Sequence, residues 1–200
     1  MPAAIDFYFD YSSPYGYFAA MKIDDLAAKN GRSVNWKPIL LGTVFKVTGG
    51  QPLPMLPLKG PYALRDILRS ARFHGLPYQQ PSKFPVATQA PARAFYWVND
   101  RDPALAKKLA QALYQAYFVQ DRDISSPEIT AAVAASVGLK RDDVLAALGN
   151  EAVKDKLKNE VEAAIARGVF GSPYFVVDDE PFWGVDRLEQ MERWLGGGPF

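Results

Sequence analysis

The stretch IDFYFDYSSPYGY, residues 5–17, most constrains how this 200-residue chain can fold. Its first half is dense in aromatic and branched residues, which predicts a short strand over residues 5–10, buried on both faces. Ser12 or Ser13 can then cap a helix over residues 14–29, with Pro14 in the first position, where its missing N–H costs nothing. Such a helix start presents a hydroxyl and free N–H groups, which favour a docked anion or thiolate. Ser-Ser-Pro is also a common capping arrangement without any function.

The near balance of charge limits the partners of the chain. It has 23 basic and 22 acidic residues, a formal net charge of +1, which argues against nucleic acid or an anionic membrane. No apolar run approaches the roughly 20 residues that span a bilayer. The start of the chain lacks the basic region and cleavable apolar run of an export signal. We therefore expect a cytoplasmic protein.

Cysteine is absent, and histidine occurs once. The lack of cysteine excludes disulfide exchange, a cysteine nucleophile and a thiolate metal site within this chain. His74 precedes Gly75 at the expected end of a helix, where histidine commonly interacts with terminal carbonyls. We therefore expect a structural role for His74 rather than a place in a Ser-His-Asp triad.

Two ends that contain strands flank a long helical stretch. Residues 33–41 (SVNWKPILL) predict a second strand, with Pro38 at a sheet edge or a strand end. Strand, helix and strand in this order imply parallel pairing. Residues 42–61, rich in Gly and Pro, predict an irregular loop. Apolar spacing and capping residues then predict helices over residues 62–73, 88–99, 103–119, 126–136, 142–148 and 151–167.

Residues 168–184 (GVFGSPYFVVDDEPFWG) change the character of the chain again. Strands over residues 174–177 and 181–183, separated by a turn at 178–180, predict a hairpin. Asp186 is expected to cap a last helix over residues 187–195, which three glycines stop. The predicted class is α/β, in the order β-α-β, helices, β-β-α.

Two motifs jointly carry a family resemblance. FDYSSPYGY and VFGSPYFVVDDEPFWGVDRLE resemble segments of the glutathione-dependent 2-hydroxychromene-2-carboxylate isomerases and the related kappa-class glutathione transferases. The resemblance extends nearly from end to end. It implies a homodimer with a thioredoxin-like fold. Residues 1–41 and 168–200 would form the thioredoxin-like domain, and residues 42–167 an inserted helical domain.

The resemblance implies glutathione as the cofactor and Ser13 as the catalytic residue that holds its thiol. Ser13 and Gly16 stand where thioredoxin-like oxidoreductases carry the two cysteines of a CxxC motif. Ser12 is a second hydroxyl, and Ser13 is preferred because it adjoins Pro14. Ser172 would precede a cis proline and pair its backbone with the glutathione main chain.

A second group of residues would bind the γ-glutamyl end of glutathione. Asp186 would accept a hydrogen bond from the glutathione amine. Val185 stands where a hydrogen-bonding side chain is usual in the family, so its contacts would be through the backbone alone. The cofactor-binding residues implied are Ser13, Ser172, Pro173, Trp183, Gly184, Val185 and Asp186.

The expected reaction is the isomerisation of 2-hydroxychromene-2-carboxylate, or a similar intermediate of aromatic degradation, to trans-o-hydroxybenzylidenepyruvate. The thiolate would add reversibly to a conjugated double bond, which rotates and then re-forms. Lys46 is the expected partner of the substrate carboxylate, and Phe45 and Phe84 line its pocket. The alternatives are a kappa-like transferase, which consumes glutathione, and a non-catalytic thioredoxin-like module that holds extended peptides.

Overall fold

The computed structural model describes residues 3–200 and contains a four-stranded mixed sheet in the order β2-β1-β3-β4. Strand β1 (Ile5–Phe9) pairs in parallel with β2 (Val34–Pro38) and antiparallel with β3 (Tyr174–Val177). Strand β4 (Glu180–Trp183) completes the hairpin with β3. The predicted parallel unit, the edge position of Pro38 and the C-terminal hairpin are confirmed.

Strand β1 lies inside the sheet, and its Ile5, Phe7 and Phe9 side chains form one buried apolar face. Phe7 and Phe9 are fully buried. The Phe7 ring stacks on Phe175 of β3 at 5.3 Å and meets Trp36 of β2 edge-on at 5.2 Å. These cross-strand aromatic pairs fix the register of the three strands.

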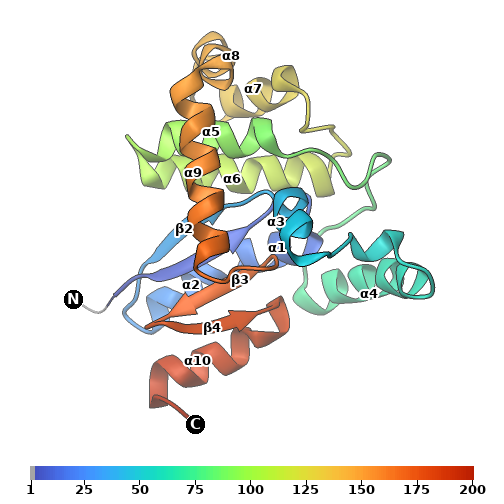
Figure 1. Ribbon diagram of the computed structural model, residues 1–200, viewed down its shortest axis with the longest axis vertical. Helices are drawn as coiled ribbons and strands as arrows, with labels where there is room; N and C mark the ends of the chain where they lie inside the picture. Colours follow the sequence, from blue (N-terminus) through green and yellow to red (C-terminus); the bar gives the residue numbers. More distant parts are fainter. Residues whose placement is uncertain (1–2) are drawn as a thin grey trace.

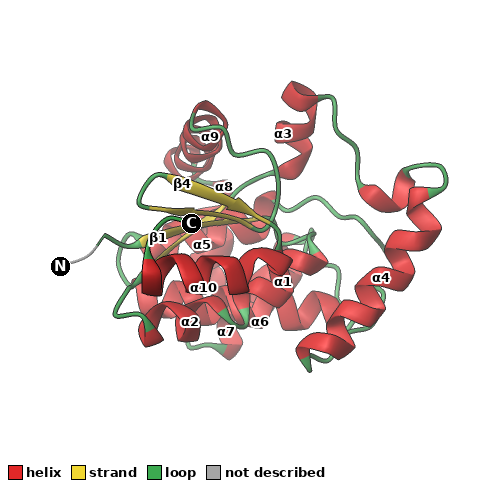
Figure 2. Ribbon diagram, turned by 90° about the horizontal axis from the view of Figure 1, so that it is seen from below, coloured by secondary structure: helices red, strands yellow, loops and turns green. Residues whose placement is uncertain are grey.

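Helices cover both faces of the sheet (Figures 1 and 2). The face shown below the sheet in Figure 2 carries α1 (Pro14–Ala20), α2 (Ile23–Lys29) and α10 (Leu188–Gly197), and α9 (Glu151–Ala166) crosses the opposite face. A further group of helices lies beyond β2 in Figure 1, and their predicted bounds agree with the structure to within one turn. They are α5 (Gln89–Asn99), α6 (Pro103–Phe118), α7 (Pro127–Ser136) and α8 (Arg141–Gly149).

The single helix predicted over residues 14–29 is wrong, because the structure has two helices there. Helix α1 is only seven residues long and ends at Ala20, and α2 begins at Ile23. Asp24 and Asp25 occupy the first turn of α2, where acidic side chains stabilise a new helix start. The short α1 therefore brings a smaller dipole to its N-terminus than the predicted helix would.

The irregular loop predicted over residues 42–61 is also wrong in part. It contains α3 (Leu41–Thr48), the short 3-10 helix η1 (Leu53–Met55) and the first residues of α4 (Lys59–His74). One of the glycines that suggested a loop instead terminates α3, because Gly49 takes the left-handed conformation at φ 73°. The close packing of η1 on α4 requires Gly60, since a Cβ there would overlap the Pro54 carbonyl.

Asp186 does not cap the last helix, contrary to the prediction. It lies inside the 3-10 helix η2 (Val185–Arg187), and Arg187 is the N-cap of α10 without a side-chain capping bond. Helix α10 includes two of the three glycines and ends at Gly198. The prediction is wrong because the chain enters α10 through η2, which places Asp186 before the N-cap position.

The division into two domains stays a prediction. Aromatic rings join the two parts, for example Phe9 of β1 and Tyr114 of α6, whose centroids lie 5.8 Å apart. Within residues 3–200, no helix combines the length and the apolar character needed to cross a bilayer.

Candidate functional site

Ser13 caps α1 and lies at the end of the β1–α1 connection. Its Oγ accepts a hydrogen bond from Gly16 N–H at 3.0 Å, which confirms the predicted cap. The same hydroxyl donates to the backbone oxygen of Ser172 at 2.9 Å, although the two residues are far apart in the sequence. Ser13 is only 6% exposed. The capping serine is therefore held against the segment that precedes β3.

The peptide bond between Ser172 and Pro173 is cis, as the resemblance implied. Ser172 Oγ accepts a hydrogen bond from Asp10 N–H at 2.9 Å. Pro173 O accepts one from Gly184 N–H at 3.1 Å. Three of the predicted segments, around Ser13, Pro173 and Gly184, thus meet at one end of the sheet.

Gly16 allows these segments to pack closely against α1. A Cβ at this position would lie 2.8 Å from Ser172 Oγ, 2.9 Å from Tyr114 Oη and 3.2 Å from Ser13 Cβ. A side chain at position 16 would therefore displace at least one of two hydroxyl groups. The close packing therefore requires glycine at position 16, and it places the Ser172 hydroxyl beside the Ser13 side chain.

The remaining predicted contacts lie on the loop after β4. Trp183 is half-exposed, and its ring meets Phe170 at 4.9 Å, while Val185 is buried. Helix η2, which holds Asp186, packs against α1. The Asp186 carboxylate is exposed and lies 3.5 Å from the Arg187 guanidinium. It is therefore accessible to a ligand amine on the same side of the molecule as α1.

Asp10 is a site residue that the sequence reasoning missed. Its carboxylate accepts hydrogen bonds from Ser12 N–H at 2.7 Å, Leu41 N–H at 2.7 Å and the Thr88 hydroxyl at 3.1 Å. Burial raises the pKa of Asp10 to about 6, although these hydrogen bonds oppose the rise. The available signal was an acid within the aromatic sequence FYFDY, directly after β1. Asp10 joins the loop before α1 to the starts of α3 and α5.

The predicted substrate residues are not brought into contact with Ser13. Lys46 is exposed on α3, and Phe45 is half-buried there. Phe84 precedes a second cis proline, Pro85, in a segment that reaches Ser12, because Val86 N–H donates to Ser12 Oγ at 3.1 Å.

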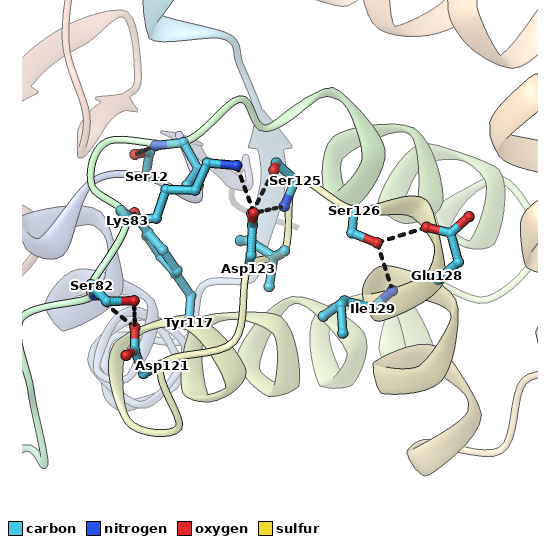
Figure 3. A network of polar contacts seen from close by, with 12 residues as sticks. Ser12, Ser82, Lys83, Tyr117, Asp121, Asp123, Ser125, Ser126, Glu128 and Ile129 are labelled. Carbon is cyan, nitrogen blue, oxygen red and sulfur yellow. Dashed lines mark hydrogen bonds and ion pairs between the residues drawn. The ribbon is translucent and has the colours of Figure 1, made fainter.

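A polar network lies beside this segment (Figure 3). Lys83 extends to Asp123, with Nζ 2.7 Å from the carboxylate. Tyr117 donates to the Lys83 carbonyl at 2.9 Å, and Asp121 accepts from the Ser82 backbone and hydroxyl. These contacts attach the loop before α5 to the end of α6. The network holds the loop in place. It also pairs Lys83 with Asp123.

His74 ends α4, as predicted, and its ring lies between those of Phe18 and Phe73, at 5.8 and 5.2 Å. Burial lowers its pKa, and so does the nearby charge of Lys22. Within residues 3–200, no hydrogen bond links His74 to a serine. The contacts support a packing role.

Comparison with known proteins gives the family of this fold. A model described as "DSBA-like thioredoxin domain" matches residues 4–196. The chain belongs to the DsbA-like thioredoxin family. In this DsbA-like domain Ser13 and Gly16 precede the cis-proline segment in the chain, and no cysteine is present.

Within the family, the chain is similar to the two groups that its motifs resemble. It is 30% identical to 2-hydroxychromene-2-carboxylate isomerase of Sphingobium xenophagum over 98% of this chain and 99% of the relative. It is 27% identical to glutathione S-transferase kappa 2 of Caenorhabditis elegans over 96% and 91%. A solved 2-hydroxychromene-2-carboxylate isomerase superposes with a TM-score of 0.87 at 28% identity, covering 96% of this chain and 94% of that one. The resemblance in the motifs is confirmed for the whole chain.

Proposed function

We propose that the protein is a glutathione-dependent isomerase of 2-hydroxychromene-2-carboxylate or of a similar aromatic carboxylate. The observation that carries the proposal is the hydrogen bond from the capping Ser13 to Ser172, which precedes a cis proline and packs closely on Gly16. Relatives named as this isomerase, similar over nearly the whole chain, support it. The proposal includes a cytoplasmic homodimer, as the family resemblance implies.

The donors present at the site fit glutathione. Ser13 and Ser172 offer hydroxyls beside Gly16, and the exposed Asp186 carboxylate is an acceptor that suits an amine. Glutathione would supply a thiolate that adds to and leaves a conjugated carbon. A thiol of pKa near 8.5 is only a few per cent ionised at neutral pH, so the protein must favour the charged form.

Ser13 is the group that would favour that form. In the structure its proton is donated to Ser172 O, and its lone pair accepts Gly16 N–H. A hydroxyl that redirects its proton to an anionic sulfur makes a charge-assisted hydrogen bond, which is stronger than the neutral bond it replaces. Because Ser13 is almost completely buried, bulk water competes little for this bond.

A kappa-like transferase is the second candidate, supported by the kappa 2 relative. The same site would serve both reactions, and the fate of glutathione distinguishes them. The isomerase returns free thiol after each turnover, whereas the transferase consumes it. Thiol titration after complete conversion of the chromene substrate therefore decides between them: constant thiol supports the isomerase, and loss equal to the product formed contradicts it.

Asp186→Ala should weaken glutathione binding by roughly tenfold or more, since a hydrogen bond to a charged group contributes about 1.5–3 kcal/mol. Titration calorimetry on wild type and variant measures this. Glu189→Ala, an exposed acid on α10 three residues later, is the matched control and should bind as wild type does. No binding by the wild type at millimolar glutathione would refute both enzyme proposals. Equal weakening by the two variants would reduce the role of Asp186 to a general charge effect.

Lys46→Ala should raise KM for an aromatic carboxylate up to about fivefold and leave kcat nearly unchanged, because an exposed ion pair contributes at most about 1 kcal/mol. Lys83→Ala is the control, since Lys83 is already paired with Asp123. Steady-state kinetics against substrate concentration test the difference. An unchanged KM in Lys46→Ala would remove this lysine from the site.

A further inference from the structure

The hydroxyl of Ser172 is free to donate a hydrogen bond. A serine hydroxyl carries one donor and two acceptor positions. Ser172 Oγ accepts from Asp10 N–H at 2.9 Å, and it donates to no acceptor within residues 3–200. Ser13 differs, because its one proton is already donated to Ser172 O at 2.9 Å. The more available donor is therefore on Ser172.

Ser172 Oγ and the Ser13 side chain lie against the same side of Gly16. A Cβ on Gly16 would lie 2.8 Å from Ser172 Oγ and 3.2 Å from Ser13 Cβ, so the two side chains converge on that point. Tyr114 Oη is equally near, at 2.9 Å, but its proton is donated to the Asp10 carbonyl at 3.0 Å. The absence of a side chain at Gly16 permits this close approach, and Asp10 N–H fixes the Ser172 oxygen beside Ser13.

We propose that the Ser172 side chain is a second hydrogen-bond donor to the thiolate of bound glutathione, acting together with Ser13. This inference rests on the proposed function and extends it, since the family resemblance gives Ser172 only a backbone contact. Helix α1 has seven residues and contributes a limited dipole, so side-chain hydroxyls must supply much of the stabilisation of the anion. Two donors lower the thiol pKa further than one.

The test compares Ser172→Thr with Ser172→Val, which have the same shape and differ in the hydroxyl. The pKa of bound glutathione is followed by the ultraviolet absorbance of the thiolate during a pH titration at saturating ligand. Titrations with S-methylglutathione, which has no thiol, subtract the tyrosine signal. We expect Ser172→Thr to keep the wild-type thiol pKa and Ser172→Val to raise it by about one pH unit, a tenfold change in acid dissociation. Ser172→Ala repeats the measurement if Ser172→Val does not fold.

A purely structural role of Ser172 gives a different result. Loss of the acceptor for Asp10 N–H would lower the melting temperature and weaken glutathione and S-methylglutathione equally, without moving the thiol pKa. An unchanged thiol pKa in Ser172→Val and Ser172→Ala, with tight binding retained, overturns this inference and leaves the proposed function intact. An equal rise in Ser172→Thr and Ser172→Val also overturns it, since the added methyl would be the cause. Absence of glutathione binding by the wild type refutes the proposed function and this inference together.

Discussion

Ser13→Ala is expected to lower the turnover of the proposed isomerisation by about 10²–10³-fold, the loss typical when one donor to a reacting anion is removed. The variant should still fold. It loses the cap on Gly16 N–H, a cost of about 1 kcal/mol, and the bond to Ser172 O. Initial rates with saturating glutathione and chromene carboxylate measure the effect, and circular dichroism confirms the fold.

Ser12→Ala is the matched control for this prediction. Ser12 is adjacent to Ser13, but its Oγ accepts from Val86 N–H, which holds it toward the segment after the second cis proline. Its removal should change turnover by only a few-fold. If Ser12→Ala lost as much activity as Ser13→Ala, the thiolate role would belong to both hydroxyls, and unchanged activity in Ser13→Ala would contradict the assignment outright.

The absence of cysteine allows a direct test of where the sulfur binds. A Ser13→Cys variant carries a single thiol, which can attack the disulfide of oxidised glutathione, form a mixed disulfide and release one glutathione thiol. We expect intact-mass spectrometry to show one glutathione attached rapidly to Ser13→Cys and slowly to Ser12→Cys. Faster labelling at position 12 would move the sulfur site away from Ser13.

Local patterns in the sequence predicted the elements whose ends are set by local chemistry. Ser13-Pro14 and Ser126-Pro127 start helices as predicted, because a capping side chain and a proline act within one turn. The hairpin also follows from local residues. Asp178 and Asp179 take positive φ values of 50° and 68°, which the two-residue turn requires and aspartate tolerates.

The elements that the sequence did not predict depend on distant contacts. Helix α3 starts at Leu41, whose N–H donates to the carboxylate of Asp10, the residue that follows β1. No pattern within residues 42–61 contains that information. Only the family resemblance predicted that Ser13 and Ser172 lie in one site. The sequence did not reveal the role of Asp10, because its three hydrogen-bond partners come from separate segments.

Asp10 should make the protein less stable as pH rises from about 4 to 6. Its carboxyl is 3% exposed and faces no arginine or lysine within ion-pair distance among residues 3–200. The groups around it are the phenols of Tyr11, Tyr114 and Tyr117 and its three hydrogen-bond donors. Burial raises its pKa from 3.8 to about 6, so the folded state holds the proton more tightly than the unfolded state does.

The sign of the effect follows from proton linkage. Below pH 3.8 the carboxyl is protonated in both states and contributes no penalty. Between the two pKa values the folded state binds more protons, so the free energy of unfolding falls as pH rises. Above pH 6 the full penalty is present, about 3 kcal/mol at roughly 1.4 kcal/mol per pH unit. Asp66, Asp123 and Asp178 have lowered pKa values and act in the opposite direction at acid pH.

Asp10→Asn isolates this contribution, because the opposing carboxylates remain in both proteins. The amide can keep one oxygen for Ser12 N–H and the Thr88 hydroxyl, but its NH₂ group faces Leu41 N–H, which costs about 1–3 kcal/mol. At pH 4 the variant should therefore be the less stable protein. By pH 7 the wild type should lose about 3 kcal/mol relative to it, so the gap closes or reverses. Urea unfolding at each pH measures the two curves.

Thr88→Val tests the same pH dependence by changing a hydrogen-bond partner of Asp10. It keeps the Asp10 carboxyl and removes one hydrogen bond that stabilises its charged form. The pKa of Asp10 should rise further, and the fall in stability should extend to higher pH than in the wild type. Parallel stability curves for wild type, Asp10→Asn and Thr88→Val would mean that Asp10 titrates alike in the folded and unfolded states. Asp10 would then connect the three segments of the site without adding any dependence on pH.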